Sequence, residues 1–434
     1  MFAKNNILKK KIYRIVSSFL FIITFFILIK KYNHYIDTEN YTKLILILIT
    51  CVNFFFGTIL KNFYKKSLIF FFYFIIIIYS TNALFVYYDI KNSPQKRLQN
   101  KFKELNIKYD KRKLLDVVNE ERVKNTNIYP YVVPREFLDK NTSKNLILTP
   151  MPNINYIACN EYGNWKIFKT DELGFNNKSL LLKFDILLMG DSFAEGSCVK
   201  SHYEPVNILK KMNTSAYSIG LSGNGLLLSL ALAHEIKSKL EFTKIVWLVY
   251  DNDFQDILIE QKSKELIKYI DRDYEGNMYF SHIGEIASYQ KKFINNNLES
   301  FKKKYSIKES LIELKAIMNR LNSFISFKKE VNYYKQQNIF KKIFLKIKKI
   351  YPKKDIFIVY LPESSCFHIR VNDCEIRAEI LKNANLDLKF LNFFDFARKN
   401  ITDYKSLYAL NQENLHFSPL GYEFLVKFIL KEIN

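Results

Sequence analysis

The chain of 434 residues carries 66 Lys and Arg against 43 Asp and Glu, a formal net charge of +23, and 48% of its residues are hydrophobic. This length excludes a disulfide-stapled miniprotein, and this apolar content excludes a disordered tail. At roughly 150 residues per domain, two or three folded units are expected. Long apolar stretches occur only in the first ninety residues, so residues 1–90 and 91–434 are treated as different kinds of sequence.

Residues 1–90 contain three apolar stretches, Tyr13–Ile29, Leu44–Leu60 and Leu68–Tyr88. A membrane-spanning helix needs about 20 apolar residues, with about 17 as a lower limit, so the third stretch predicts a transmembrane helix and the first two are short candidates. Lysines precede the first stretch as in a signal peptide, but Lys30 and Lys31 follow it without a small-residue cleavage site. Buried globular helices are the alternative, which the scarcity of charges disfavours. The sequence therefore predicts a membrane anchor of three helices.

The orientation of this anchor is only weakly encoded. Basic residues flank the spans on both sides, so the positive-inside rule is nearly balanced. An N-terminus held inside by its lysines, followed by three spans, places the C-terminal region outside. We therefore expect a multi-pass protein of the inner cell membrane whose catalytic region is extracytoplasmic or periplasmic.

The positive charge raises the question of a nucleic-acid partner. The lysines beyond residue 91 are scattered rather than gathered in a stripe, which is typical of a solvated surface. The expected partners are therefore the membrane and a substrate, with no nucleic acid. The basic residues that follow the third stretch can also touch anionic lipid headgroups.

Five cysteines bear on the compartment. Cys51 lies in the second apolar stretch, and Cys159, Cys198, Cys366 and Cys374 lie beyond the anchor without a C-x-x-C pair, so no structural zinc site is expected. In an oxidising compartment Cys366 and Cys374 can close a short loop, with Cys159 and Cys198 as the remaining pair. In a reducing compartment all four stay free thiols.

The region after the anchor divides into three parts. Residues 91–150 are charged and predict a stalk or linker, and residues 151–183 predict a β-rich lead-in with a hairpin over 153–170. Residues 184–434 alternate strand and helix patterns, with a Lys-rich helical insertion at about 296–349. The strands are expected at Phe184–Met189, Ala216–Ile219, Lys244–Tyr250 and Ile356–Tyr360, with helices such as Leu226–Leu240 and Phe424–Ile433 among them. This alternation predicts an α/β fold with a parallel sheet covered by helices on both faces.

Polar residues follow the predicted strands at the edge where ligands bind in such sheets. Ser192 follows the first strand, within Gly-Asp-Ser-Phe, and Gly223 lies in a glycine-rich turn after the second. Asn252 follows the third strand, and His416 precedes the last helix with Glu413 three residues before it. Each feature alone is more often a turn or a helix cap. Together and in this order they predict one site.

The residue types suit acyl transfer. A serine hydroxyl is a weak nucleophile that needs a base such as His416, whose imidazole needs a carboxylate such as Glu413 to fix its tautomer. The tetrahedral oxyanion needs preorganised donors, which the backbone N–H groups of Ser192 and Gly223 and the side chain of Asn252 can supply. The other aspartates of these turns are expected to be supporting residues.

These four ordered blocks resemble those of the SGNH (GDSL-type) hydrolase family, over about Phe184 to Asn434. The resemblance implies a flavodoxin-like three-layer α/β/α fold, Ser192 as nucleophile, Ser192, Gly223 and Asn252 as oxyanion donors, and His416 as catalytic base. It implies no metal or organic cofactor. Two positions depart from the family pattern: Glu413 replaces the usual Asp before the His, and Tyr250 replaces the usual Gly of the third block.

The predicted function is a membrane-anchored serine ester hydrolase that acts through an acyl-Ser192 intermediate on O-acyl groups of cell-envelope glycans. An O-acyltransferase that uses the same triad to modify an envelope polysaccharide is the first alternative. A non-catalytic glycan-binding or assembly module is the second. A lipase is disfavoured, because the membrane spans account for the apolar content without an acyl-chain tunnel.

Overall fold

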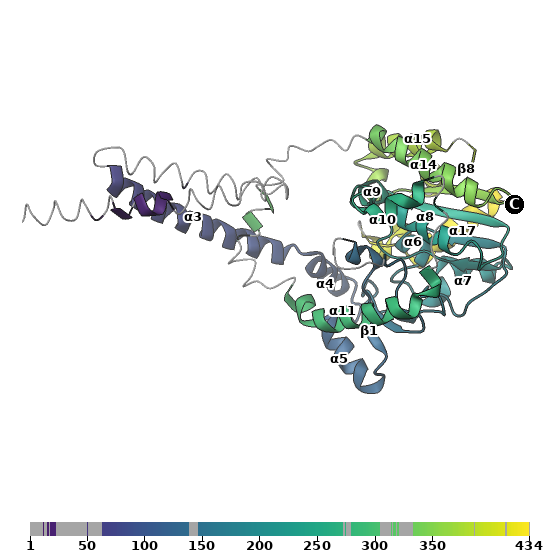
Figure 1. Ribbon diagram of the computed structural model, residues 1–434, viewed down its shortest axis with the longest axis horizontal. Coiled ribbons are helices and arrows are strands. Elements are labelled where there is room, and N and C mark those ends of the chain that lie inside the picture. The colour runs from purple at the N-terminus through teal and green to yellow at the C-terminus, as the bar shows by residue number, and fades with distance from the viewer. Residues whose placement is uncertain are drawn as a thin grey trace, which may run out of the picture. The chain divides into compact units, whose positions relative to one another are not determined.

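The computed structural model describes residues 12, 15, 16, 18–22, 50, 63–138, 146–271, 274, 279–303, 314, 316, 317, 319, 320, 333–385, 387–412 and 415–433. The chain forms two compact units (Figure 1). The smaller unit comprises Met1–Arg97 and Lys302–Val331, and the larger one comprises Leu98–Phe301 and Asn332–Asn434.

The smaller unit is dominated by the apolar helix α3, Phe63–Lys91. Large apolar side chains along it are exposed, such as Phe72 at 69% and Ile77 at 61%. Among the described residues one helical stretch, Ile69–Glu104, is long and apolar enough to cross a membrane, by length and composition alone. It contains most of the third predicted span. The first two predicted spans lie almost entirely outside the described residues, so the multi-pass anchor is not supported by the structure.

The larger unit is built on a five-stranded sheet whose strands are all parallel. Its order is β5-β4-β6-β7-β8, so the first strand in the chain lies between the second and the third. This is the doubly wound order in which the chain reverses direction across the sheet between the first and third strands. The predicted parallel α/β sheet is confirmed. Its strands are β4 (Ile186–Met189), β5 (Ala216–Ser218), β6 (Lys244–Tyr250), β7 (Asp355–Leu361) and β8 (Lys389–Asn392).

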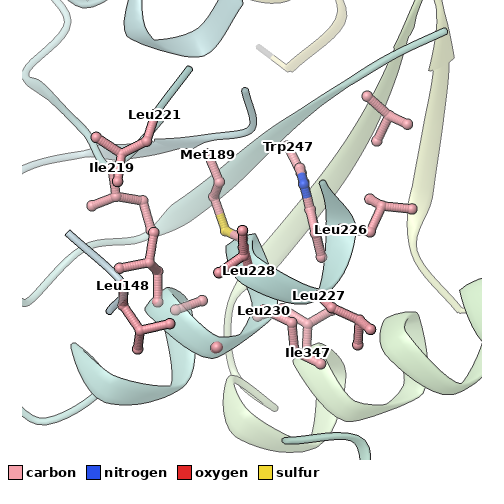
Figure 2. Packing of buried hydrophobic residues seen from close by; sticks show 14 of the residues in the cluster. Leu148, Met189, Ile219, Leu221, Leu226, Leu227, Leu228, Leu230, Trp247 and Ile347 are labelled. Carbon is pink, nitrogen blue, oxygen red and sulfur yellow. The ribbon is translucent and has the colours of Figure 1, made fainter. Parts of the chain in front are cut away.

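Helices cover both faces of this sheet because successive residues of its buried strands point to opposite sides. On one face Met189 of β4 and Trp247 of β6 pack against α8 and Ile347 of α14, as Figure 2 shows. On the other face, Leu188 and Leu248 share a core with residues of α7, α16 and α17. The described α-helices that lie wholly or mostly in this unit are α4 (Pro94–Glu104), α5 (Leu114–Lys124), α6 (Ser192–Glu195), α7 (Pro205–Lys211), α8 (Leu226–Glu235), α9 (Asp253–Glu260), α10 (Lys264–Ile267), α11 (Ile283–Lys303), α14 (Tyr333–Ile350), α15 (Val371–Ala384), α16 (Phe393–Asn400) and α17 (Pro419–Ile433).

A three-stranded sheet precedes the larger one in the chain. The predicted hairpin forms, as β2 (Asn155–Ile157) paired antiparallel with β3 (Ile167–Lys169). A further strand that the sequence did not indicate, β1 (Ile128–Pro130), pairs parallel with β2. The stretch expected as a stalk is therefore folded in this part: Phe102 of α4 and Val118 of α5 are fully buried.

The segment expected as a helical insertion is helical at both described ends, in α11 and α14. The apolar residues of α14 belong to the main core, with Phe340, Ile343 and Ile347 fully buried. α14 is thus the helix that leads into β7 and covers the sheet, rather than an addition to it. Between the two helices the structure describes only residues 314, 316, 317, 319 and 320.

Candidate functional site

Ser192 lies where β4 gives way to the short helix α6. Gly190 forms the turn with a φ of +138°, and a Cβ there would lie 2.5 Å from the Leu248 carbonyl oxygen, so the turn requires glycine. The Asp191 carboxylate caps α6 by accepting the Phe193 backbone N–H at 2.9 Å. Ser192 is 8% exposed, and its Oγ is 3.5 Å from Asp191 Oδ2, too far for a strong hydrogen bond. Its hydroxyl is therefore not held by Asp191.

The glycine-rich turn after β5 lies against α6. The Ser222 backbone N–H donates to Glu195 Oε2 at 3.1 Å, and Leu221 N–H donates to the Gly190 carbonyl at 3.2 Å. Gly223 follows with a φ of +77°. Since α6 and this turn are joined by these bonds, the backbones of Ser192 and Gly223 are presented at the same edge of the sheet.

Asn252 completes the predicted donor set. It follows β6 as the N-cap of α9, and Tyr250 beside it stacks on Phe193 at 4.1 Å between ring centroids. Within the described part of the chain, no acceptor is bonded to the backbone N–H of Ser192 or Gly223, and Asn252 Oδ1 is buried without a hydrogen-bond partner. These N–H groups remain available at the point where the sheet reverses its strand order, which is where such folds bind ligands.

His416 lies in the loop before α17, and the centroid of its ring is 5.5 Å from the centroid of the Phe193 ring. Its Nδ1 is 2.8 Å from Oε1 of Glu161, and its backbone N–H donates to Oε2 of the same carboxylate at 3.1 Å. The carboxylate fixes the tautomer that carries the proton on Nδ1, so Nε2 is the basic nitrogen. No hydrogen bond joins His416 to Ser192 in the structure, as is common before a substrate tightens the site.

The structure places the Glu161 carboxylate, which the sequence did not indicate, on His416. Glu413 lies outside the described residues. Glu161 comes from the loop between β2 and β3, 255 residues before His416 in the chain. No spacing pattern could have linked the two residues. The only sequence signal was that a hairpin precedes the α/β region.

Burial and neighbouring groups act on the pKa values of His416 and Asp191 in opposite directions. Burial lowers the pKa of His416, but the carboxylates of Glu161, Asp191 and Glu195 together outweigh it, and the pKa lies above the ordinary 6.5. Burial raises the pKa of the Asp191 carboxyl to about 7, although the Phe193 N–H and the charge of His416 favour its ionised form. Glu161 therefore stabilises the imidazolium that forms when His416 accepts a proton.

A disulfide ties the two sides of this site together. Cys159 and Cys198 are bonded, and Cys198 Sγ lies 3.5 Å from His416 Nδ1. Cys159 precedes Glu161 by two positions, and Cys198 follows α6. Because the bond joins the hairpin to the segment after the Ser192 turn, it holds Glu161 within reach of His416.

Residues of the stretch predicted as a stalk also contact the elements around the glycine-rich turn. Tyr131 donates its hydroxyl to Glu195 Oε1 at 2.6 Å, and Arg135 forms an ion pair with Asp256 of α9. A Cβ on Gly223 would lie 3.6 Å from Arg135 Nε. Segments before the α/β region thus complete the walls of the site.

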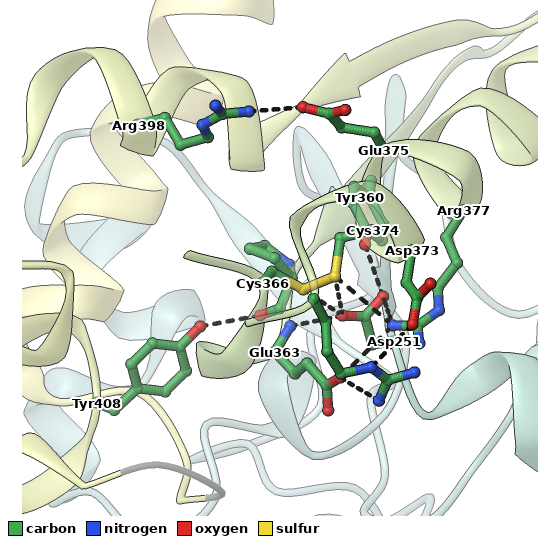
Figure 3. The surroundings of a disulfide bond; sticks show 12 residues. Asp251, Tyr360, Glu363, Cys366, Asp373, Cys374, Glu375, Arg377, Arg398 and Tyr408 are labelled. Atoms are coloured by element: carbon green, nitrogen blue, oxygen red, sulfur yellow. Dashed lines mark hydrogen bonds and ion pairs between the residues drawn. A yellow bond between two sulfur atoms is a disulfide. The ribbon is translucent and has the colours of Figure 1, made fainter. Parts of the chain in front are cut away.

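Asp251 has a structural role, as the sequence led us to expect. It is buried, and its Oδ1 accepts from Tyr360 at 2.6 Å and pairs with Arg377 at 2.9 Å. Figure 3 shows this network beside the second disulfide, Cys366–Cys374. The network fastens the end of β6 to β7 and α15 and so fixes the backbone from which Asn252 extends.

Among the residues that the structure describes, two groups of side chains have the residue types of metal ligands: Glu161, Cys198 and His416 in one, and Asp251, Glu363, Cys366 and Cys374 in the other. The cysteine sulfurs of both groups are engaged in disulfides, so none is a thiolate. The first group then offers only an imidazole and a carboxylate already bonded to each other. Neither donor set matches the ligand count of a structural or catalytic zinc site.

No protein-family model matches the chain, and no curated protein resembles it in sequence. Among solved structures, a salicylyl-acyltransferase from a tetracycline biosynthetic pathway matches 63% of this chain and 57% of its own length, with 9% identity and a TM-score of 0.33. Two Clostridium thermocellum proteins also match, a family 3 carbohydrate esterase (57% of this chain, 94% of its own; 11% identity; TM-score 0.29) and a family two carbohydrate esterase (63% and 67%; 14%; 0.31). The chain thus spans little more than half of the acyltransferase. Likeness at these scores identifies no family, so we take function from the geometry of the site.

Proposed function

We propose that the chain is a serine ester hydrolase of the SGNH type that works through an acyl-Ser192 intermediate. The observation that carries the proposal is the pair formed by Glu161 and His416 beside the Ser192 turn. A carboxylate on Nδ1 leaves Nε2 as the base, and free N–H groups lie at the same sheet edge. A nucleophile, an oriented base and oxyanion donors are the parts that acyl transfer needs.

In the first half-reaction Ser192 Oγ attacks the ester carbonyl while His416 Nε2 takes its proton. The carbonyl oxygen gains negative charge and is met by the N–H groups of Ser192 and Gly223 and by the Asn252 amide. His416 then gives the proton to the departing alkoxide, which leaves Ser192 acylated. In the second half-reaction His416 Nε2 takes a proton from water, whose oxygen attacks the acyl carbon. The bond between that carbon and Ser192 Oγ then breaks, His416 returns the proton to Oγ, and the acid is released.

As substrate we propose an O-acylated glycan of the cell envelope, with the enzyme held at the inner membrane by a multi-pass anchor and its larger unit outside the cytoplasm. The apolar helix α3 supports membrane attachment. The two disulfides support an oxidising compartment, because disulfides persist outside the cytosol and are rare within it.

Transfer of the acyl group to a sugar hydroxyl, in place of water, is the second candidate. The low exposure of Ser192, 8%, favours it because an enclosed nucleophile limits the access of water. Labelled acetate that appears on a glycan acceptor without net release of acetate would establish transfer.

The test is hydrolysis of p-nitrophenyl acetate by the full-length protein in mild detergent, beside Ser192→Ala. Ser288→Ala, which removes a hydroxyl bonded to the Gly284 carbonyl on α11, is the matched control. We expect turnover in the wild type and in Ser288→Ala and none above background in Ser192→Ala. Equal turnover in all three proteins would overturn the proposal.

A further inference from the structure

A second feature adjoins the site, a groove of about 930 Å³ that does not contain Ser192. Its size is within the usual range of ligand pockets, ~300–1,000 Å³. The hairpin around β3 forms one side of it, and the segment from Cys198 to α7 forms the other.

The groove meets the candidate site at one end. Cys198, which lines it, lies 3.5 Å from His416 Nδ1. Tyr162, which also lines it, follows Glu161 directly and donates its hydroxyl to the Phe417 carbonyl at 3.3 Å. A chain molecule in this groove would therefore approach the base from the side of the disulfide.

The lining of the groove is basic. It contains five lysines, and its one acidic residue, Glu204, forms an ion pair with one of them, Lys166. Glu204 is buried and receives the Lys166 ammonium at 2.8 Å and the Asn176 amide at 3.0 Å. Because Glu204 has these partners, it does not offset the charge of the other four lysines.

Three of these four, Lys169, Lys178 and Lys200, are exposed, and within the described part of the chain none forms an ion pair. They come from three separate segments, namely β3, the loop between β3 and β4, and the loop after α6. Several ammonium groups held around one groove attract a ligand that carries negative charge at several points.

The groove also presents aromatic surface. Trp165 is half-buried, and its Nε1 donates to the Arg112 carbonyl at 3.2 Å, which fixes the indole in the hairpin. Tyr162 is half-buried on the same loop. Flat aromatic faces suit the apolar faces of sugar rings, so the groove combines a surface for rings with charges for anionic substituents.

We propose that this groove binds the acidic polysaccharide chain whose acyl groups reach Ser192, with Lys169, Lys178 and Lys200 recognising anionic substituents along the chain. The inference rests on the proposed function and names the substrate class as a polyanionic glycan. Carboxylates of uronic acids and phosphodiesters share the chemistry that the lysines recognise.

The test is binding to the full-length protein in detergent, measured at several salt concentrations. The probes are a polygalacturonate oligosaccharide for carboxylates, a poly(glycerol phosphate) oligomer for phosphodiesters, and a neutral cello-oligosaccharide. The groove variant combines Lys169→Ala, Lys178→Ala and Lys200→Ala. The matched control removes the same charge from exposed lysines elsewhere, with Lys382→Ala, Lys399→Ala and Lys427→Ala. Thermal unfolding shows that both variants are folded.

We expect one of the anionic probes to bind and the neutral probe not to bind. The groove variant should bind about 10-fold more weakly, as three exposed charge contacts suggest, and its salt slope should fall by about 2. The control variant should bind as the wild type does, and the triple Lys→Arg variant should restore binding. The anionic probe that binds identifies the source of the charge.

Three results would overturn the proposal for the groove. These are an equal loss of affinity in both alanine variants, binding of the neutral probe as tight as that of the anionic probe, and equally tight binding of a single-stranded oligonucleotide of matched charge. The p-nitrophenyl acetate assay separates the two proposals. Ser192-dependent turnover without anionic binding would refute the groove alone, and anionic binding without turnover would refute the esterase alone.

Discussion

Replacing Glu161 by Gln tests the assignment of the orienting carboxylate. The carboxylate is 14% exposed and accepts two N–H groups of His416, Nδ1 at 2.8 Å and the backbone at 3.1 Å. Gln keeps the shape but loses the charge that stabilises imidazolium. In serine hydrolases the equivalent change costs about 10⁴ in kcat. Because the site is partly open to solvent, we expect a loss of about 10²–10⁴, or ~3–5 kcal/mol at 1.36 kcal/mol per tenfold.

The same variant should change the pH profile. The base must be neutral, so activity rises with pH through the pKa of His416, which Glu161 holds above 6.5. Without the carboxylate, the largest contribution that opposes burial is lost and this pKa falls, so the acidic limb of the kcat/KM profile should move to lower pH. Hydrolysis of p-nitrophenyl acetate from about pH 5 to about pH 9 measures both effects. Glu413→Gln is the comparison, and a larger loss there than in Glu161→Gln would refute the assignment.

Three further predictions concern the donors, the disulfides and the turn. Asn252→Ala should lower kcat by about 10²–10³ with little change in KM in steady-state kinetics, and a loss confined to KM would contradict its role as an oxyanion donor. The two disulfides close loops of 39 and 8 residues, so loss of the bond in Cys159→Ala should lower the free energy of unfolding by about 4 kcal/mol and loss of the bond in Cys366→Ala by about 2.5 kcal/mol. Thermal unfolding measures both, and a larger loss in Cys366→Ala than in Cys159→Ala would refute this. Gly190→Ala places a Cβ 2.5 Å from the Leu248 carbonyl oxygen and should destabilise by about 2–4 kcal/mol in denaturant unfolding, whereas a neutral result would show that the turn relaxes.

The sequence predicted the main sheet well because its central strands are short and apolar. β6 forms over the predicted residues Lys244–Tyr250, and β7 extends the predicted strand by one residue at each end. β8 was missed because it is an edge strand with Lys389 and Asn392 at its ends and no fully buried residue. β1 was missed because it is three residues long and ends in Pro130.

The residues of the candidate site were predictable where each follows a strand. Ser192, Gly223 and Asn252 follow three neighbouring parallel strands, so local patterns were sufficient to place them at one edge of the sheet. Glu161 could not be predicted because it arrives on a hairpin outside that sheet and is fixed by tertiary contacts, among them the Cys159–Cys198 bond. The groove could not be predicted from the sequence for the same reason, since its lysines come from separate segments.

Covalent labelling of Ser192 tests the central claim most directly. The full-length protein is treated with a fluorophosphonate, which reacts with activated serines, and the modified peptide is identified by mass spectrometry in the wild type and in His416→Ala. The account predicts a single adduct on Ser192 in the wild type and almost none in His416→Ala, because His416 activates the hydroxyl. An unlabelled Ser192, or labelling that does not depend on His416, would contradict it.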